Sequence, residues 1–128
     1  MQLNLERPDY TWFLRGADGA HALVNDRTFD HGFAMSPESM IEDWPVTDAS
    51  ALVPDDLLPL LALEPELIVL GTGPTQRFPP AAVMHACLSR GIGLEAMDNA
   101  AAARTYSVLA GEGRRVVVAF VFPRADGA

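Results

Sequence analysis

The feature that most constrains the fold is a continuously apolar run, Leu67–Leu70, which ends at Gly71. A run without alternating polar residues is typical of a strand that is buried on both faces. Pro79-Pro80 then opens a helix that we expect to continue to about Arg90 and to end at Gly91, because proline suits the first turn of a helix and glycine its end. A doubly buried strand followed by a helix favours a layered α/β arrangement.

Two more strands and a second helix extend this pattern. Gly93–Met97 is predicted as a short strand, and Asp98-Asn99 as the cap of a helix that reaches Ala110 and ends at Gly111. Residues 115–122 form the last predicted strand. The order strand, helix, strand, helix, strand predicts an α/β fold of three layers around a largely parallel central sheet.

The first third of the chain predicts β-structure. Thr11–Leu14 and Ala22–Val24 are β-prone, and the turn signal Ala17-Asp18-Gly19 between them indicates a β-hairpin. Thr28–Met35 is predicted as one further strand, with Gly32 as a bulge. We expect this material to pack on the C-terminal unit or to extend its sheet.

An acidic, proline-containing connector spans residues 47–66. Trp44-Pro45-Val46, just before it, is expected to be extended, since a residue before proline avoids the helical region. Thr47–Ser50 and Asp55–Leu58 each predict a short helix, the second with Pro54 in its first turn. The connector is rich in leucine, which argues against a linker between domains, so residues 1–128 are expected to form one domain.

Composition excludes several classes of function. The 128 residues carry a net charge of −8, which disfavours non-specific binding to nucleic acid or to an anionic membrane. The single cysteine, Cys87, excludes an intrachain disulfide and any multi-cysteine metal site, and no metal or other cofactor is expected. Residues 1–8 lack the pattern of a signal peptide, and no apolar run approaches the roughly 20 residues that span a bilayer. These features predict a cytoplasmic protein that does not insert into membranes.

Charge is distributed unevenly along the chain. Residues 1–66 hold 13 acidic residues and three arginines, whereas residues 67–128 hold four acidic residues and six arginines. One interpretation is that the first half simply contributes more solvated surface. Alternatively, the second half presents a locally positive face to an acidic ligand or partner.

A candidate binding site lies where the two parallel strands end. Gly71-Thr72-Gly73 follows the first strand and Asp98 follows the second, so the two loops meet if these strands are neighbours. Backbone N–H groups in a glycine-rich loop suit an anion. The alternative is that the glycines only permit a tight exit from a buried strand. Gln76 occupies the third position of a dinucleotide-binding fingerprint, and the chain has no lysine for a phosphate-binding loop.

The predicted helix over 100–110 adds further candidates. Helical periodicity centres its core face on Thr105, places Ala103 and Ser107 on the far side, and puts Arg104 and Tyr106 on the flanks. Arg104 could present its guanidinium to an anionic ligand or partner, or could form a structural ion pair. For Tyr106 the simpler interpretation is packing against the sheet.

Four segments together resemble a known family. They are Leu67–Gly73, Gly91–Asp98, Ala101–Leu109 and Glu112–Val116, and their order and spacing match over about residues 20–122. The family is one of unknown molecular function whose eukaryotic relatives include mitochondrial NADH dehydrogenase (complex I) assembly factor three and an adipogenesis-associated protein. The resemblance implies a three-layer α/β fold with a mixed central sheet and an added β-hairpin, no established catalytic activity and, in the mitochondrial branch, an accessory role in assembly.

The resemblance also selects residues. Three positions depart from the family pattern: Asn99 stands where it favours Thr, Ala103 where it favours Cys, and Ser107 where it favours Asn. The ligand- or partner-binding residues that we expect, from the loops and the resemblance together, are Gly71, Thr72, Gly73, Asp98, Arg104, Tyr106, Glu112 and Arg114.

The leading hypothesis is a non-catalytic binding or assembly-accessory protein that recognises a protein partner, such as a membrane-complex subunit, or a small anion. The alternative is an enzyme that binds a small molecule, an anion or a nucleotide, in the crevice at the carboxyl ends of the strands. A third hypothesis is a purely structural module, or one whose site lies on the acidic first half, where residues 36–66 would carry the partner surface.

Overall fold

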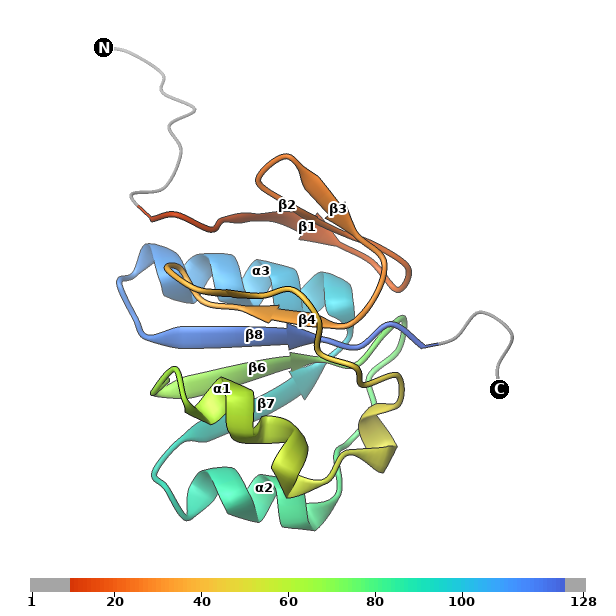
Figure 1. Cartoon of the computed structure of the whole chain (residues 1–128), viewed down its shortest axis with the longest axis vertical. Coiled ribbons are helices and arrows are strands. Elements are labelled where there is room, and N and C mark those ends of the chain that lie inside the picture. The colour runs from red at the N-terminus through yellow and green to blue at the C-terminus, as the bar shows by residue number, and fades with distance from the viewer. Residues whose placement is uncertain (1–9, 124–128) are drawn as a thin grey trace.

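A five-stranded mixed sheet forms the centre of the computed structural model, which describes residues 10–123 (Figure 1). Its strands lie in the order β5-β4-β8-β6-β7. β6 (Leu67–Gly71) pairs in parallel with both β7 (Gly93–Met97) and β8 (Val116–Phe120), whereas β4 (Phe33–Met35) pairs antiparallel with β8 and with β5 (Met40–Ile41). All five residues of β6 and of β8 are buried, in agreement with the apolar runs from which both strands were predicted.

The predicted hairpin is present, and a third strand extends it into a second, antiparallel sheet. It consists of β1 (Leu14–Ala17), β2 (Ala22–Val24) and β3 (Arg27–Phe29). The first strand was wrongly predicted over 11–14, because the Asn25 side chain holds this stretch: it accepts from Phe13 N at 3.0 Å and donates to Thr11 O at 3.0 Å.

The single strand predicted over 28–35 is also wrong. Its first part is β3 of the small sheet, and its second part is β4 of the large sheet. Gly32 lies in the link between β3 and β4, where the chain passes from the small sheet to the large one. A Cβ atom at this position would collide with the carbonyl oxygen of Trp44. Trp44–Val46, expected to be extended, pairs with no strand of either sheet; Trp44 is buried, and its indole N–H donates to Asp56 O at 2.8 Å.

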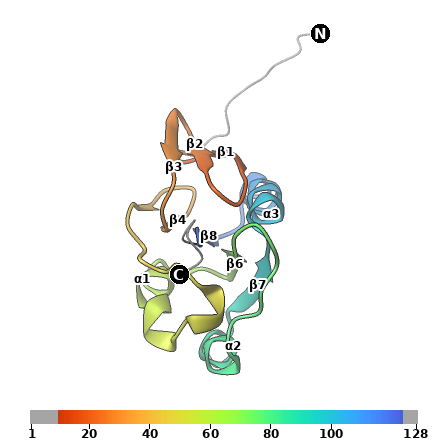
Figure 2. The same cartoon turned by 90° about the vertical axis from the view of Figure 1, so that its right-hand side faces the viewer.

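Helices cover both faces of the central sheet, which gives three layers (Figures 1 and 2). One face carries α3 (Asn99–Gly111) and the small sheet. The other face carries three short helices of the connector, η1 (Ala49–Ala51), η2 (Pro54–Leu57) and α1 (Leu58–Leu61). It also carries α2 (Ala81–Leu88), which follows β6. The α/β class, the mixed central sheet and both predicted connector helices are thus confirmed.

The two faces have different cores. On the α3 side, Phe33 stacks on Phe29 with ring centroids 4.2 Å apart and on Phe120 at 5.2 Å, so one aromatic column joins the two sheets. The opposite side is aliphatic around Trp44 and includes the buried thiol of Cys87, whose pKa burial raises.

The orientation of α3 differs from the prediction. Ala103 and Tyr106 are buried, whereas Val108, assigned to the core face, is 60% exposed. The reason is that β1 packs along α3, so the helix is covered by two sheets instead of one. The helix ends at Gly111, as predicted, and in the turn that follows it the φ of +77° at Gly113 lets the N–H of Arg114 reach Leu109 O at 3.1 Å.

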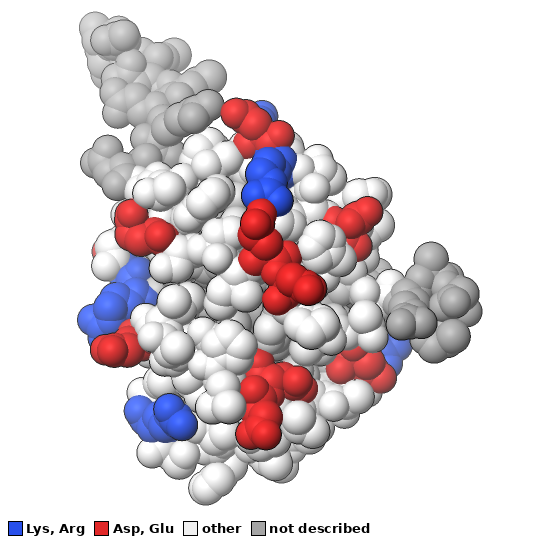
Figure 3. Space-filling view, in the orientation of Figure 1, with Lys and Arg blue, Asp and Glu red and all other residues white. Residues whose placement is uncertain are grey.

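No helix among residues 10–123 is long and apolar enough to cross a bilayer. The charge imbalance of the sequence is visible at the surface. Acidic side chains are spread over the face that Figure 3 shows, and a run of them crosses its middle.

Candidate functional site

The loops after β6 and β7 meet at the carboxyl edge of the sheet, and Asn99 joins them. This side chain is fully buried. Its Oδ1 accepts from Gly73 N at 2.9 Å, and its amide nitrogen donates to Val121 O and to Asp18 O, both at 3.1 Å. Asn99 therefore ties the glycine loop, the end of β8 and the β1–β2 turn into one frame.

The Gly71-Thr72-Gly73 loop uses its polar groups internally. Thr72 N donates to Met97 O at 2.9 Å, and Gly73 N donates to Asn99. The buried Thr72 hydroxyl donates to Thr75 O at 2.7 Å and accepts from Arg77 N at 3.0 Å. At Gly71 a Cβ atom would lie 2.5 Å from Asn99 Oδ1, so this glycine permits a close approach of two segments. The N–H groups of Thr72 and Gly73 are thus already engaged, and the geometry is that of a tight exit from a buried strand.

Asp98 lies beside this loop as the N-cap of α3. Its carboxylate accepts from Ala101 N at 2.8 Å, which satisfies one of the free N–H groups of the first helical turn. The cap was predicted for Asp98-Asn99 jointly. The structure divides the roles, with Asp98 outside as the cap and Asn99 inside as the connector.

The other four predicted site residues lie elsewhere. Arg104 is exposed in the middle of α3, and Tyr106 is buried beneath the chain before β1, where its hydroxyl donates to Trp12 O at 3.2 Å and burial raises its pKa. Glu112 and Arg114 follow α3 at the opposite end of the sheet, where Arg114 Nε lies 3.3 Å from Glu66 Oε1. The eight residues do not converge on one site.

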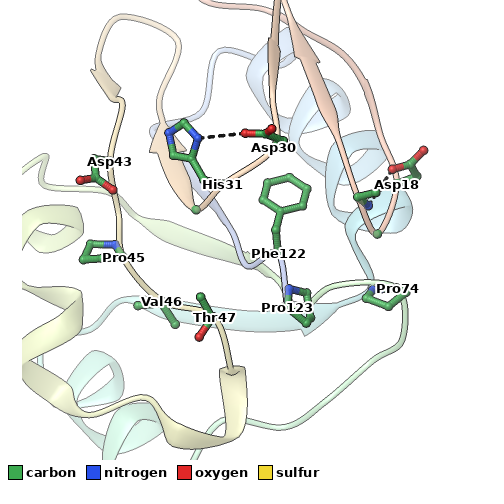
Figure 4. Close-up of a pocket in the computed structure, with 13 residues that line it drawn as sticks. Asp18, Asp30, His31, Asp43, Pro45, Val46, Thr47, Pro74, Phe122 and Pro123 are labelled. Atoms are coloured by element: carbon green, nitrogen blue, oxygen red, sulfur yellow. Dashed lines mark hydrogen bonds and ion pairs between the residues drawn. The ribbon is translucent and has the colours of Figure 1, made fainter. Parts of the chain in front are cut away.

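An open cavity of about 880 Å³ does adjoin the carboxyl edge (Figure 4). Three acidic residues from separate segments belong to its lining: Asp18 from the β1–β2 turn, Asp30 from the β3–β4 link and Asp43 from the segment between β5 and η1. Phe122 lies between them, and Pro74, Pro123, Pro45 and Val46 supply further apolar lining. We call this cavity, with these residues and His31, the acidic cavity.

Asp18 is held in its ionised form. Its Oδ1 accepts from Ala20 N and from His21 N, both at 2.8 Å, and these hydrogen bonds lower the pKa of the carboxyl group. The same bonds shape the turn that places Asp18 beside the cavity, and Asn99 anchors this turn from within. The negative charge at this position is therefore built into the fold.

His31 is the titratable group of the acidic cavity that changes charge near neutral pH. Its Nδ1 lies 3.3 Å from Asp30 Oδ1, and its Nε2 lies 3.0 Å from Glu42 O. Both partners accept hydrogen bonds, so they favour the doubly protonated ring and raise its pKa, Asp30 most of all. When charged, His31 offsets part of the negative charge around the cavity.

The described residues that line the acidic cavity include no arginine, so their charge suits a cationic group better than an anion. The sequence prediction located a binding edge at the carboxyl ends of the strands but missed Asp18, Asp30, His31, Asp43 and Asn99. The available signal was the excess of acidic residues in the first half of the chain. Among residues 10–123, no three His, Cys, Asp or Glu side chains are grouped so that they could hold a metal ion.

Comparison with known proteins identifies similar chains in several bacteria. A family model described as a protein of unknown function (DUF498/DUF598) matches residues 15–121. A Xanthomonas campestris protein solved by NMR is 54% identical, with a TM-score of 0.82, over 95% of this chain and 92% of that chain. A Bordetella pertussis protein, described as a Mth938-like domain, is 29% identical, with a TM-score of 0.81, over 98% and 96% of the two chains.

A curated relative from Francisella tularensis subsp. holarctica carries the description "13 kDa major membrane protein". It is 27% identical over 95 residues, which cover 73% of this chain and 77% of that protein.

Proposed function

The chain belongs to the family of proteins of unknown function (DUF498/DUF598), and we propose that it is a non-catalytic binding protein with an accessory role in assembly. Its partner places a basic segment in the acidic cavity. The observation that carries the proposal is that three acidic residues from distant parts of the chain, Asp18, Asp30 and Asp43, lie in the lining of one cavity with an apolar floor.

The lining of the cavity suits an arginine- or lysine-containing peptide. Phe122 and Val46 are 6% and 8% exposed and provide apolar surface at its base. The aliphatic stems of Arg and Lys pack on apolar surface while their cationic heads stay at a polar rim. Asp30 and Asp43 lie at that rim. The apolar base would therefore contact the stem of such a side chain, and these two acidic residues would attract its cationic head.

A membrane-complex subunit is the partner class that fits this chemistry. Cytoplasmic loops next to membrane helices are enriched in Lys and Arg. An acidic cavity on a cytoplasmic protein would complement such loops. The name of the Francisella relative and the assembly role within the resembled mitochondrial branch both support a partner at the membrane.

The charge of the cavity weighs against the alternative of an enzyme that binds a nucleotide or another anion in this crevice. Carboxylates at the rim would repel an anionic ligand. The N–H groups of Thr72 and Gly73, which would have held it, are engaged internally.

The proposal is tested by photo-cross-linking in the native host. A photoreactive residue replaces Thr47, which is exposed at the cavity, and mass spectrometry identifies the attached peptides. We expect Lys- and Arg-rich peptides from a membrane-complex subunit, and their loss in the charge-reversed variant Asp30→Arg/Asp43→Arg. Glu95→Arg, an exposed acidic position on β7, is the matched control. Cross-links that persist in the charge-reversed variant would refute the role of the acidic cavity.

A further inference from the structure

A second surface, a groove between β1 and α3, has the opposite charge. It encloses about 430 Å³ and shares no residue with the acidic cavity. Gly16 lines one wall, and Ala103 and Ser107 line the other, where the Ser107 hydroxyl lies 3.4 Å from Leu14 O. These small residues leave space beside the helix, and β1 runs along it (Figures 1 and 2).

Two exposed arginines line this groove, Arg15 from β1 and Arg104 from α3. No carboxylate among residues 10–123 forms an ion pair with either, and the one hydrogen bond between them and the described chain is a long one, 3.5 Å from Arg15 to Asn25 O. By contrast, Arg27 and Arg114 form ion pairs with Glu42 and Glu66. Within residues 10–123, the two guanidinium groups at the groove therefore keep most of their donors available for a ligand.

We propose that this groove binds an acidic segment of a partner protein. The carboxylates of an extended peptide would each meet a guanidinium fork, which matches carboxylate geometry in a bidentate manner. An apolar side chain between them would contact Val108, which is 60% exposed at the same groove. We name the groove, lined by Arg15, Gly16, Ala103, Arg104, Ser107 and Val108, the arginine groove.

The charge of the whole chain decides which anionic partner fits. A net charge of −8 repels an extended polyanion such as nucleic acid, whereas a short acidic peptide senses mainly the two local arginines. The inference goes beyond the proposed function, because it uses other residues. The proposed function and the binding of an acidic segment at this groove can therefore fail independently of each other. If both hold, one small domain joins a basic segment to an acidic one.

An NMR titration tests the arginine groove. The isotope-labelled chain is titrated with a short peptide of alternating Glu and Leu, and with the same peptide carrying Gln for Glu. We expect shift changes confined to β1 and α3 with the acidic peptide. In Arg15→Gln/Arg104→Gln, the affinity should fall by at least about tenfold, since charge-assisted hydrogen bonds are lost. Arg90→Gln, an exposed arginine beyond α2, is the matched control.

A steric variant separates shape from charge. A Cβ at Gly16 meets no atom within 4 Å, so Gly16→Leu begins without a clash, and because Gly16 lines the groove the longer side chain should obstruct it. We expect it to abolish peptide binding while both arginines remain. Absence of shift changes with the acidic peptide, equal binding of the Gln peptide, or full affinity in either variant would overturn the proposal. Concentration-dependent dimerisation that the double arginine variant abolishes would identify a second copy of this chain as the occupant, and would likewise overturn it.

Discussion

The two ends of the parallel strands use polar side chains in opposite ways. At the carboxyl end, Asn99 and Thr72 are fully buried and bind backbone groups of several segments. At the amino end, Glu66 accepts from Arg115 N at 3.0 Å and pairs with Arg114, all in contact with solvent. Buried groups that lose their partners cost far more than exposed ion pairs. The carboxyl end is therefore a rigid frame that positions outward-facing charges, whereas the amino end is held by replaceable contacts.

The variant Asn99→Leu should break this frame and have the largest effect. It leaves Gly73 N, Val121 O and Asp18 O without their side-chain partner, so we expect a loss of about 3 kcal/mol or more in the free energy of unfolding. Urea denaturation measures the loss. The control is Gln76→Leu, since that amide makes an exposed bond to Ala96 O and should cost under about 0.5 kcal/mol. Equal costs for the two variants would contradict the comparison.

Two Gly→Ala substitutions test how tightly the frame at the carboxyl end is packed. Gly71→Ala introduces a methyl group 2.5 Å from Asn99 Oδ1 and 2.8 Å from the Phe120 ring, and should destabilise the chain by about 2 kcal/mol. Gly111→Ala meets no neighbouring atom inside α3 and should stabilise by about 0.5–1 kcal/mol. Thermal unfolding of both variants should thus show changes of opposite sign. A stabilised Gly71→Ala would mean that the frame is loose.

At the amino end, Glu66→Gln should cost less than either disruptive change at the frame. The N–H of Arg115 and then the Arg114 side chain lower the pKa of Glu66, so its contribution is present above the unfolded value of 4.5 and is lost as the pH falls through the folded value. Unfolding measured at decreasing pH should show the wild type converging on Glu66→Gln. A constant difference down to acidic pH would contradict this assignment.

The smallest effect is expected at His31, on the rim of the acidic cavity. Because Asp30 and then Glu42 O raise the pKa of His31, the contribution to stability is complete below the unfolded value of 6.5 and is lost as the pH rises through the folded value. We expect His31→Gln to remove this pH dependence from thermal unfolding. NMR titration of the His31 ring gives the midpoint directly, and a midpoint at or below the unfolded value would contradict the two hydrogen bonds.

The elements with strong local signals could be predicted from the sequence. The apolar run located β6, and Asp98 marked the start of α3, because both signals depend on residues close together in the chain. The face of α3 could not be predicted in the same way. Helical periodicity assumes one buried face, whereas the second sheet covers Ala103 and Ser107 as well.

The candidate site shows a further limit of sequence reasoning. Glycine spacing indicated Gly71–Gly73 as a candidate, yet the contact in which Asn99 accepts the N–H of Gly73 depends on how two loops pack. Asp18, Asp30 and Asp43 lie in three separate segments, and each by itself resembles ordinary solvated surface. Only the antiparallel addition of β4 to β8 and the course of the segment after β5 bring them to one cavity. Charge imbalance indicated the acidic half of the chain, but not the place where its charges converge.

The position of β8 has a consequence for biosynthesis. This strand is the last to be translated among those described, yet it lies between β4 and β6 and is the only strand that joins the two halves of the large sheet. While the ribosome makes the earlier strands, β4 and β6 each present a hydrogen-bonding edge without a neighbour on that side. Long-range pairing of this kind folds slowly, and exposed edges favour aggregation. Nascent chains of this protein should therefore depend on chaperones until β8 has emerged.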